Sequence, residues 1–244
     1  MNTLRRKERE YQQREELILN VAQQMLLEVG YVGLTIDRIA EATEYSKGTI
    51  YQHFSCKEDI LLALSGQAMQ KRTELFERAA TFKGKTRERM TAIGQADELF
   101  VLLYPDHFQS EQIFKIDSLW AKTSPERRAR LQSYNFRCLS ISVDIVRDAI
   151  TQGDLELRLL KSPEELVYTL VSLTFGSHRL ALTDGPIIQQ LGIENPFTLL
   201  RASLHTLLDG VGWRPLTSEW DYKATSEQIQ QEVFPGECER AYAQ

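Results

Sequence analysis

Residues 35–54 read TIDRIAEATEYSKGTIYQHF, and this stretch decides the fold. Ile36 and Ile39 share one face of a short predicted helix, where the small Ala40 lets a second helix cross closely. A short turn follows, and Ser46 suits the start of the second helix because its hydroxyl can accept a backbone N–H. Two short helices joined in this way are typical of a helix-turn-helix unit, whose second helix meets base edges of DNA with its exposed first turn.

Helical periodicity extends over most of the remaining chain, and no stretch alternates as a strand does, so the sequence predicts an all-α fold. A capping residue followed by proline predicts the start of three later helices, at Ser124-Pro125, Ser162-Pro163 and Asn195-Pro196. Ser55…Glu58 and Ser162…Glu165 have the spacing of capping boxes. We predict helices over 15–29, 36–42, 46–53, 56–80, 86–103, 106–118, 125–152, 163–183 and 196–210.

Two domains are expected: a helix-turn-helix domain with a basic N-terminal arm in residues 1–60, and a larger helical bundle in residues 61–244. The segment after Trp213 has no long periodic stretch. Its aromatic residues predict that it packs on the bundle; they are Trp213, Trp220, Tyr222 and Phe234.

Composition sets the protein class. The chain of 244 residues is 42% hydrophobic and 26% charged, which is ordinary for a globular protein. Its net charge of -5 provides no overall positive field for nucleic acid or anionic lipid. The 3 cysteines are widely spaced, which argues against a disulfide framework. Neither a signal peptide nor a membrane-spanning run is recognisable, so we expect a soluble, cytoplasmic protein that does not bind membranes.

The motif resembles the DNA-binding domain of TetR/AcrR-type bacterial transcriptional regulators. The matching stretches are GYVGLT at 30–35, IA at 39–40, SKGTIYQHF at 46–54 and KE at 57–58. The resemblance implies a bundle that binds a ligand and dimerises, and a repressor that binds a palindromic operator as a homodimer and is released by a small-molecule effector. Glu44-Tyr45 departs from the family, which commonly has glycine and then a small apolar residue; a left-handed non-glycine residue costs about 1–2 kcal/mol.

The resemblance and the motif together predict a set of DNA contacts. It comprises Thr35, Ser46, Lys47, Gly48, Thr49, Tyr51, Gln52, His53 and Lys57. Lys47 begins the second helix and can reach a guanine edge or a phosphate, whereas Tyr51 and His53 either contact phosphate or simply pack. The basic arm (Arg5, Arg6, Lys7, Arg9 and Arg14) either reaches phosphates or the minor groove or is a solvated tip.

In the bundle, the resemblance implies a dimer formed through the helices near 163–183 and 196–210. The candidate effector residues are Asp97, Phe100, Tyr104, Trp120, Tyr134, Arg137 and His178. Asp97 stands in an otherwise apolar row of its predicted helix, and a buried carboxylate needs a partner. That partner could be Arg137, Arg179 or a cationic ligand. An internal ion pair, an exposed helix edge and plain core packing are the alternatives for these residues.

Enzyme motifs fail at identifiable positions. Gly84-Lys85-Thr86 lacks the Walker glycine five residues earlier, where Ala79 stands. His107 and Glu111 are the one helix-face pair with metal-ligand spacing, and two ligands make a weak site. We therefore predict a non-enzyme with no cofactor and no metal. The alternative function is a helical ligand-binding or scaffolding protein that retains a non-functional helix-turn-helix; a redox role for Cys56 is a further, less favoured option.

Overall fold

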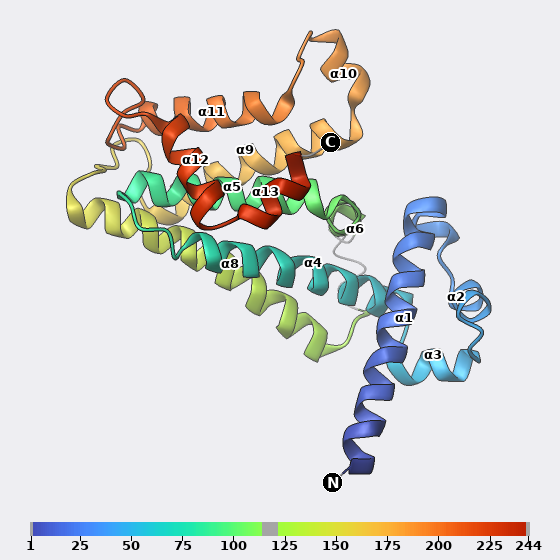
Figure 1. Cartoon of the computed structure of the whole chain (residues 1–244). Helices are drawn as coiled ribbons and strands as arrows, with labels where there is room; N and C mark the ends of the chain where they lie inside the picture. Colours follow the sequence, from blue (N-terminus) through green and yellow to red (C-terminus); the bar gives the residue numbers. More distant parts are fainter. Residues whose placement is uncertain (1, 114–121, 243–244) are drawn as a thin grey trace. The chain divides into compact units, whose positions relative to one another are not determined.

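The computed structural model describes residues 2–113 and 122–242, and every regular element in these ranges is a helix (Figure 1). The all-α prediction is thus confirmed. In chain order the helices are α1 (Asn2–Gly33), α2 (Ile36–Thr43), α3 (Lys47–His53), α4 (Lys57–Ala79), α5 (Thr86–Leu103), α6 (Pro105–Ile113), α8 (Pro125–Gln152), α9 (Pro163–Thr183), α10 (Gly185–Gln190), α11 (Pro196–Gly210), α12 (Tyr222–Glu232) and α13 (Pro235–Tyr242).

The predicted capping residues start the helices that follow them. Ser46 accepts the backbone N–H of Thr49 at 3.1 Å, Ser162 that of Glu165 at 3.2 Å, and Asn195 that of Thr198 at 2.9 Å. These bonds satisfy N–H groups that the first turn of a helix leaves without an internal partner. At α4 the capping partner differs from the expected Glu58: the Ser55 N–H and hydroxyl both donate to Asp59, at 3.4 Å.

Helix α1 is much longer than the predicted 15–29, because it begins at Asn2. Residues 2–14 are mostly polar, and Leu4 and Tyr11 are too few to form an apolar stripe that would reveal a helix. Pairs one turn apart support this part, such as Arg6 Nε to Glu10 Oε1 at 2.8 Å. The other end matches the expectation, since Gly30 interrupts the helix with a φ of 68° that side chains disfavour.

Contacts divide the chain into two compact units, Met1–Lys71 with Tyr104–Asn135 and Arg72–Leu103 with Phe136–Gln244. In the first unit α1 packs against α2 and α6, and α2 packs against α3. Fully buried apolar side chains join these helices; they include Ile18, Leu26, Leu34, Ile39, Ile50 and Phe54. The predicted division at residue 60 stays a prediction.

In the second unit α9 lies beside α11, and α12 and α13 pack on α5 (Figure 1). Arg87 of α5 is completely buried and holds the C-terminal segment. Its Nη1 donates to the carbonyls of Trp213 at 2.6 Å and Pro215 at 3.0 Å and to Asp209 Oδ1 at 2.6 Å. The segment after Trp213 therefore packs on the bundle, as its aromatic residues predict, although α12 and α13 were not predicted as helices.

None of the helices in the described part of the chain has the length and apolar character needed to cross a membrane.

Candidate functional site

A side-chain cap at the start of α2 and two backbone hydrogen bonds at its end shape the helix-turn-helix. The Thr35 hydroxyl caps α2 by accepting the Arg38 N–H at 3.3 Å. At the other end Glu44 adopts a left-handed conformation, with φ 57° and ψ 24°, and its N–H reaches Glu41 O at 3.2 Å. The Tyr45 N–H then donates to Ala40 O at 3.0 Å. Glu44 thus performs the C-capping that glycine does more easily, despite the cost to a residue with a side chain.

One face of α3 is exposed and the other is buried. Ile50 is completely buried, whereas Tyr51 is 55% exposed. Ser46, Lys47, Gly48 and Gln52 are also exposed, and Thr49 is half-buried. The cap bond at Ser46 leaves the first turn of α3 facing solvent with a lysine, a glycine and a threonine, and its backbone N–H groups favour anions.

Lys47 has an intramolecular partner. Its Nζ lies 2.8 Å from Asp37 Oδ2 in the first turn of α2, and both side chains are more than half exposed. The hydrogen bond to Asp37 raises the pKa of Lys47, so the ammonium stays charged at neutral pH. An exposed pair of this kind contributes little free energy, so a phosphate or a guanine can compete for the lysine.

Two of the predicted DNA contacts, His53 and Lys57, also have partners inside the protein. The side chain of His53 is fully buried, with its ring stacked on Tyr11 at a centroid distance of 4.0 Å. Burial lowers the pKa of His53, which favours a neutral imidazole. Lys57 Nζ donates to the carbonyls of Tyr31 at 3.2 Å and Leu34 at 3.4 Å. Each residue therefore has a structural role in the free protein, and its contact with DNA stays a prediction.

The basic arm is helical in the structure. Arg5, Arg6, Lys7 and Arg9 are exposed on the first turns of α1, in the same unit as α2 and α3. A helix places these cations more firmly than a disordered tip does.

The helix-turn-helix coincides with a match to a known family. Residues 18–64 match the family described as bacterial regulatory proteins, tetR family. The resemblance to this family that the sequence motif predicts is thus confirmed over this stretch.

Curated relatives align with a limited part of the chain. The chain is 40% identical over 58 residues to the HTH-type transcriptional repressor AcnR of Corynebacterium glutamicum, an alignment that covers 24% of this chain and 31% of AcnR. It is 31% identical over 90 residues to the fatty acid metabolism regulator protein of Bacillus subtilis, covering 37% of this chain and 45% of that protein. The chain thus matches less than half the length of these curated relatives.

Solved structures extend the similarity of fold. A bacterial regulatory protein in the tetR family from Rhodococcus RHA1 superposes with a TM-score of 0.63 at 18% identity, covering 82% of this chain and 97% of that one. The second unit therefore has the general helical architecture found in solved TetR-family regulators.

In the second unit the structure corrects the expected partner of Asp97. Its Oδ1 lies 3.3 Å from Arg72 Nε and its Oδ2 lies 3.4 Å from His178 Nδ1. Neither Arg137 nor Arg179 was the partner: Arg137 is exposed and pairs with Glu77 at 2.8 Å. Spacing along one helix could not indicate Arg72, because it lies on α4, a different helix from Asp97.

The remaining effector candidates are dispersed. Phe100 is completely buried beneath the Arg72 guanidinium, 4.3 Å from its ring centre, and so belongs with Asp97 and His178. Tyr104 and Tyr134 are half-buried members of the first unit. Trp120 lies outside the described residues. The structure thus brings together three of the seven candidates.

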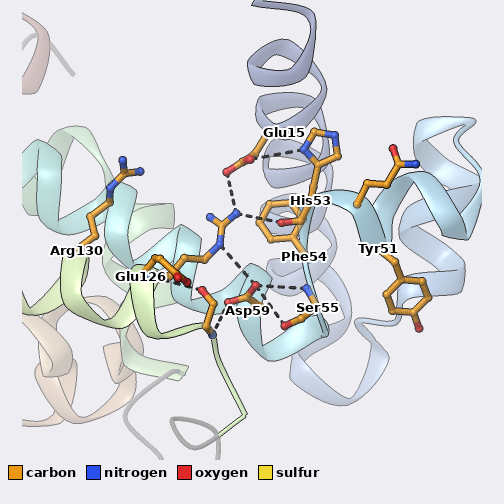
Figure 2. Close-up of a pocket in the computed structure, with 11 residues that line it drawn as sticks. Glu15, Tyr51, His53, Phe54, Ser55, Asp59, Glu126 and Arg130 are labelled. Carbon is orange, nitrogen blue, oxygen red and sulfur yellow. Dashed lines mark hydrogen bonds and ion pairs between the residues drawn. The ribbon is translucent and has the colours of Figure 1, made fainter. Parts of the chain in front are cut away.

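Sequence reasoning missed a charged network in the first unit, which surrounds an open pocket of about 550 Å³ (Figure 2). Its centre is Arg127 of α8, which contacts Glu15 of α1 and Asp59 of α4. The only sequence signal is the basic cluster of Arg127, Arg128 and Arg130 just after the Ser124 cap. Sequence alone does not show which of these arginines is internal.

Proposed function

We propose that this TetR-family regulator is a repressor that binds a palindromic operator as a homodimer, through the exposed first turn of α3, and is released by a small-molecule effector. The single observation that carries the proposal is the Ser46-capped N-terminus of α3, where Lys47 and Gly48 are exposed while Ile50 is buried. This is the end of a recognition helix that meets base edges in the major groove.

The fold of the free protein does not require a glycine at position 48. A Cβ built at this glycine would meet only Ser46 Oγ, at the ordinary contact distance of 3.7 Å, and its φ is not positive. The free protein therefore tolerates alanine at position 48. We propose that the missing side chain serves close approach to the DNA, with Lys47 and Thr49 beside it as candidates to contact bases.

Tyr51 lies one turn further along α3, where a groove-bound helix approaches the DNA backbone. We assign its hydroxyl to a phosphate, a contact that positions the protein without reading sequence. Thr35, Ser46 and Gln52 complete the proposed contact set, and the exposed cations of α1 add phosphate contacts. His53 and Lys57 are left out, because their polar groups have internal roles.

The experiment is a binding titration of the purified chain against DNA from upstream of its own gene and against random DNA at fixed salt. Lys47→Ala should lose about 1–3 kcal/mol on the operator and relax preference at one base position per half-site. Tyr51→Phe should weaken operator and random DNA by similar factors. Gly48→Ala should bind the operator less tightly while melting at or above the wild-type temperature. A wild-type protein without operator preference would refute the proposal and favour a scaffolding function.

Dimerisation is proposed through α9 and α11, which pack side by side. Each presents apolar side chains to solvent: Tyr168 is 75% exposed and Val171 43% on α9, and Leu199 is 48% exposed on α11. Small exposed residues stand beside them, such as Ala202 on α11. A single reading unit needs a partner for affinity and register, and a two-fold interface gives an operator its palindromic symmetry.

We place the proposed effector site in the second unit, around Asp97, Phe100 and His178. His178 is 2% exposed and Phe100 is fully buried, so a ligand there would be largely shielded from water. Burial lowers the pKa of His178, which leaves a neutral imidazole able to accept or donate a hydrogen bond. Because the proposed partner is an operator, we expect the protein to act in the cytoplasm.

A further inference from the structure

Arg127, in the first turn of α8, makes three polar contacts and one ring contact within the first unit. Its Nη2 donates to Glu15 Oε1 of α1 at 3.0 Å and to the backbone carbonyl of His53 at 3.2 Å. Its Nε lies 3.6 Å from Asp59 Oδ2 at the start of α4. The guanidinium also lies over the ring of Phe54, 4.5 Å from its centre. One side chain therefore joins α1, the end of α3 and α4, and Figure 2 labels its partners Glu15, His53 and Asp59.

The end of α3 depends on such a contact. This helix has seven residues and ends at His53, and the last carbonyls of a helix have no partner within it. Arg127 supplies a charged donor to one of them and also stands beside the favourable negative end of the helix. Glu15 reinforces the junction from α1, because its Oε2 lies 3.6 Å from His53 Nδ1 while its Oε1 accepts from Arg127.

The network is shielded enough for its geometry to matter. The side chains of Arg127 and Glu15 are 20% and 24% exposed, and that of Asp59 is 4% exposed. Removing one member of a shielded charge network leaves its partners without compensation, and this costs far more than breaking a surface pair. Arg127 is therefore placed to fix the direction of α3 relative to α1.

We propose that Arg127 is a positioning residue for the recognition helix: it holds the C-terminal end of α3 against α1, so that Lys47 and Tyr51 meet DNA in register. This inference rests on the proposed DNA-binding function. It assigns to Arg127 no contact with DNA, so its effect must appear as lost discrimination between sequences and not as a general loss of attraction to phosphate.

Arg130 provides a matched control. It stands three residues later on the same helix, lines the same pocket and carries the same charge, but it is exposed. Within the described ranges it has no hydrogen bond or ion pair, and Figure 2 shows its side chain apart from the network. Replacing either arginine with glutamine removes one positive charge from the same surface, and only Arg127→Gln disconnects α3.

Glu15→Gln is a further test, because charge and positioning predict opposite changes in its affinity for the operator. This substitution removes a negative charge from a DNA-binding unit, so electrostatics alone predicts tighter binding to any DNA. The positioning role predicts weaker operator binding, because a neutral amide holds Arg127 and His53 less firmly. Arg127→Lys keeps the charge but loses the fork that reaches several acceptors, and should fall between wild type and Arg127→Gln.

The experiment measures the affinity of wild type and the four variants for the operator and for random DNA, at fixed salt and well below each melting temperature. We expect Arg127→Gln to lose about tenfold or more on the operator, and no more than Arg130→Gln on random DNA. Partial unfolding would lower the affinities for operator and random DNA by the same factor. A fall in the ratio of operator affinity to random-DNA affinity therefore identifies a positioning role. If Arg127→Gln does not fold, Glu15→Gln and Arg127→Lys carry the same test.

The inference is overturned if Arg127→Gln and Arg130→Gln lose equally on both DNAs, or if Glu15→Gln binds the operator more tightly than wild type does. These results differ from a failure of the proposed function, in which the wild-type chain itself would show no operator preference.

Discussion

Glu44 offers a test of the helix-turn-helix geometry, because it occupies a left-handed conformation with φ 57° and ψ 24°. A non-glycine residue there costs about 1–2 kcal/mol, which glycine avoids. Glycine in turn makes the unfolded chain more flexible, at a cost of about 0.4–1 kcal/mol. We therefore expect Glu44→Gly to stabilise the protein by roughly 0.5–1 kcal/mol, an increase in melting temperature of about 1–4 °C for a chain of this size.

Glu41→Gly is the matched control, with the same substitution three residues earlier at an exposed position of α2. Its backbone is helical, so glycine there brings no relief and costs up to about 1 kcal/mol. Thermal unfolding of both variants, followed by far-UV circular dichroism at one pH, gives the comparison. The reasoning is refuted if Glu44→Gly melts below wild type, or if the two variants change the melting temperature in the same direction.

Further expectations concern charge, acid and assembly. Asp37→Asn should tighten binding to operator and random DNA by up to about fivefold, because it releases Lys47 and removes a negative charge. Weaker binding in a titration would mean that Asp37 holds Lys47 in its binding position. Burial lowers the pKa of all 4 histidines in the folded chain, so the unfolded chain takes up their protons first as the pH falls. The free energy of unfolding measured in urea should therefore be fully present above about pH 6.5 and fall below it, by at most about 1.4 kcal/mol per pH unit for each histidine. A flat profile from pH 7.5 to 5.5 would contradict this. Val171→Asp should give a folded monomer by light scattering, whereas Leu170→Asp, at a position only 8% exposed, should unfold the protein; a folded dimer of Val171→Asp would place the interface elsewhere.

Local signals predicted the fold well where a single residue type determines the geometry. Ser124, Ser162 and Asn195 each precede proline, and α8, α9 and α11 begin at the predicted residues. Gly30 ends the regular part of α1 as expected. Helices without a clear apolar stripe or cap signal were missed. The first turns of α1 are mostly polar, and α12 and α13 are short helices that pack against α5.

In the candidate site too, local features were predicted from the sequence and contacts with distant residues were not. The exposed first turn of α3 follows from the motif, because a cap and a buried Ile50 determine which side faces solvent. The sequence left packing open for His53 but could not name its partner Tyr11 in α1, nor the partners of Lys57, which are the carbonyls of Tyr31 in α1 and Leu34 just after it. Arg127 was missed for the same reason, because its carboxylate partners lie far away in the sequence.

The central claim is that α3 reads an operator, and the salt dependence of binding tests it most directly. Titration of the wild-type chain with DNA from upstream of its own gene, between 50 and 200 mM salt, should show a fall in affinity of about 10³–10⁵-fold, as expected for roughly 6–10 phosphate contacts. Random DNA should bind more weakly at every salt concentration. An affinity that hardly changes with salt, or that is equal for both DNAs, would contradict the claim.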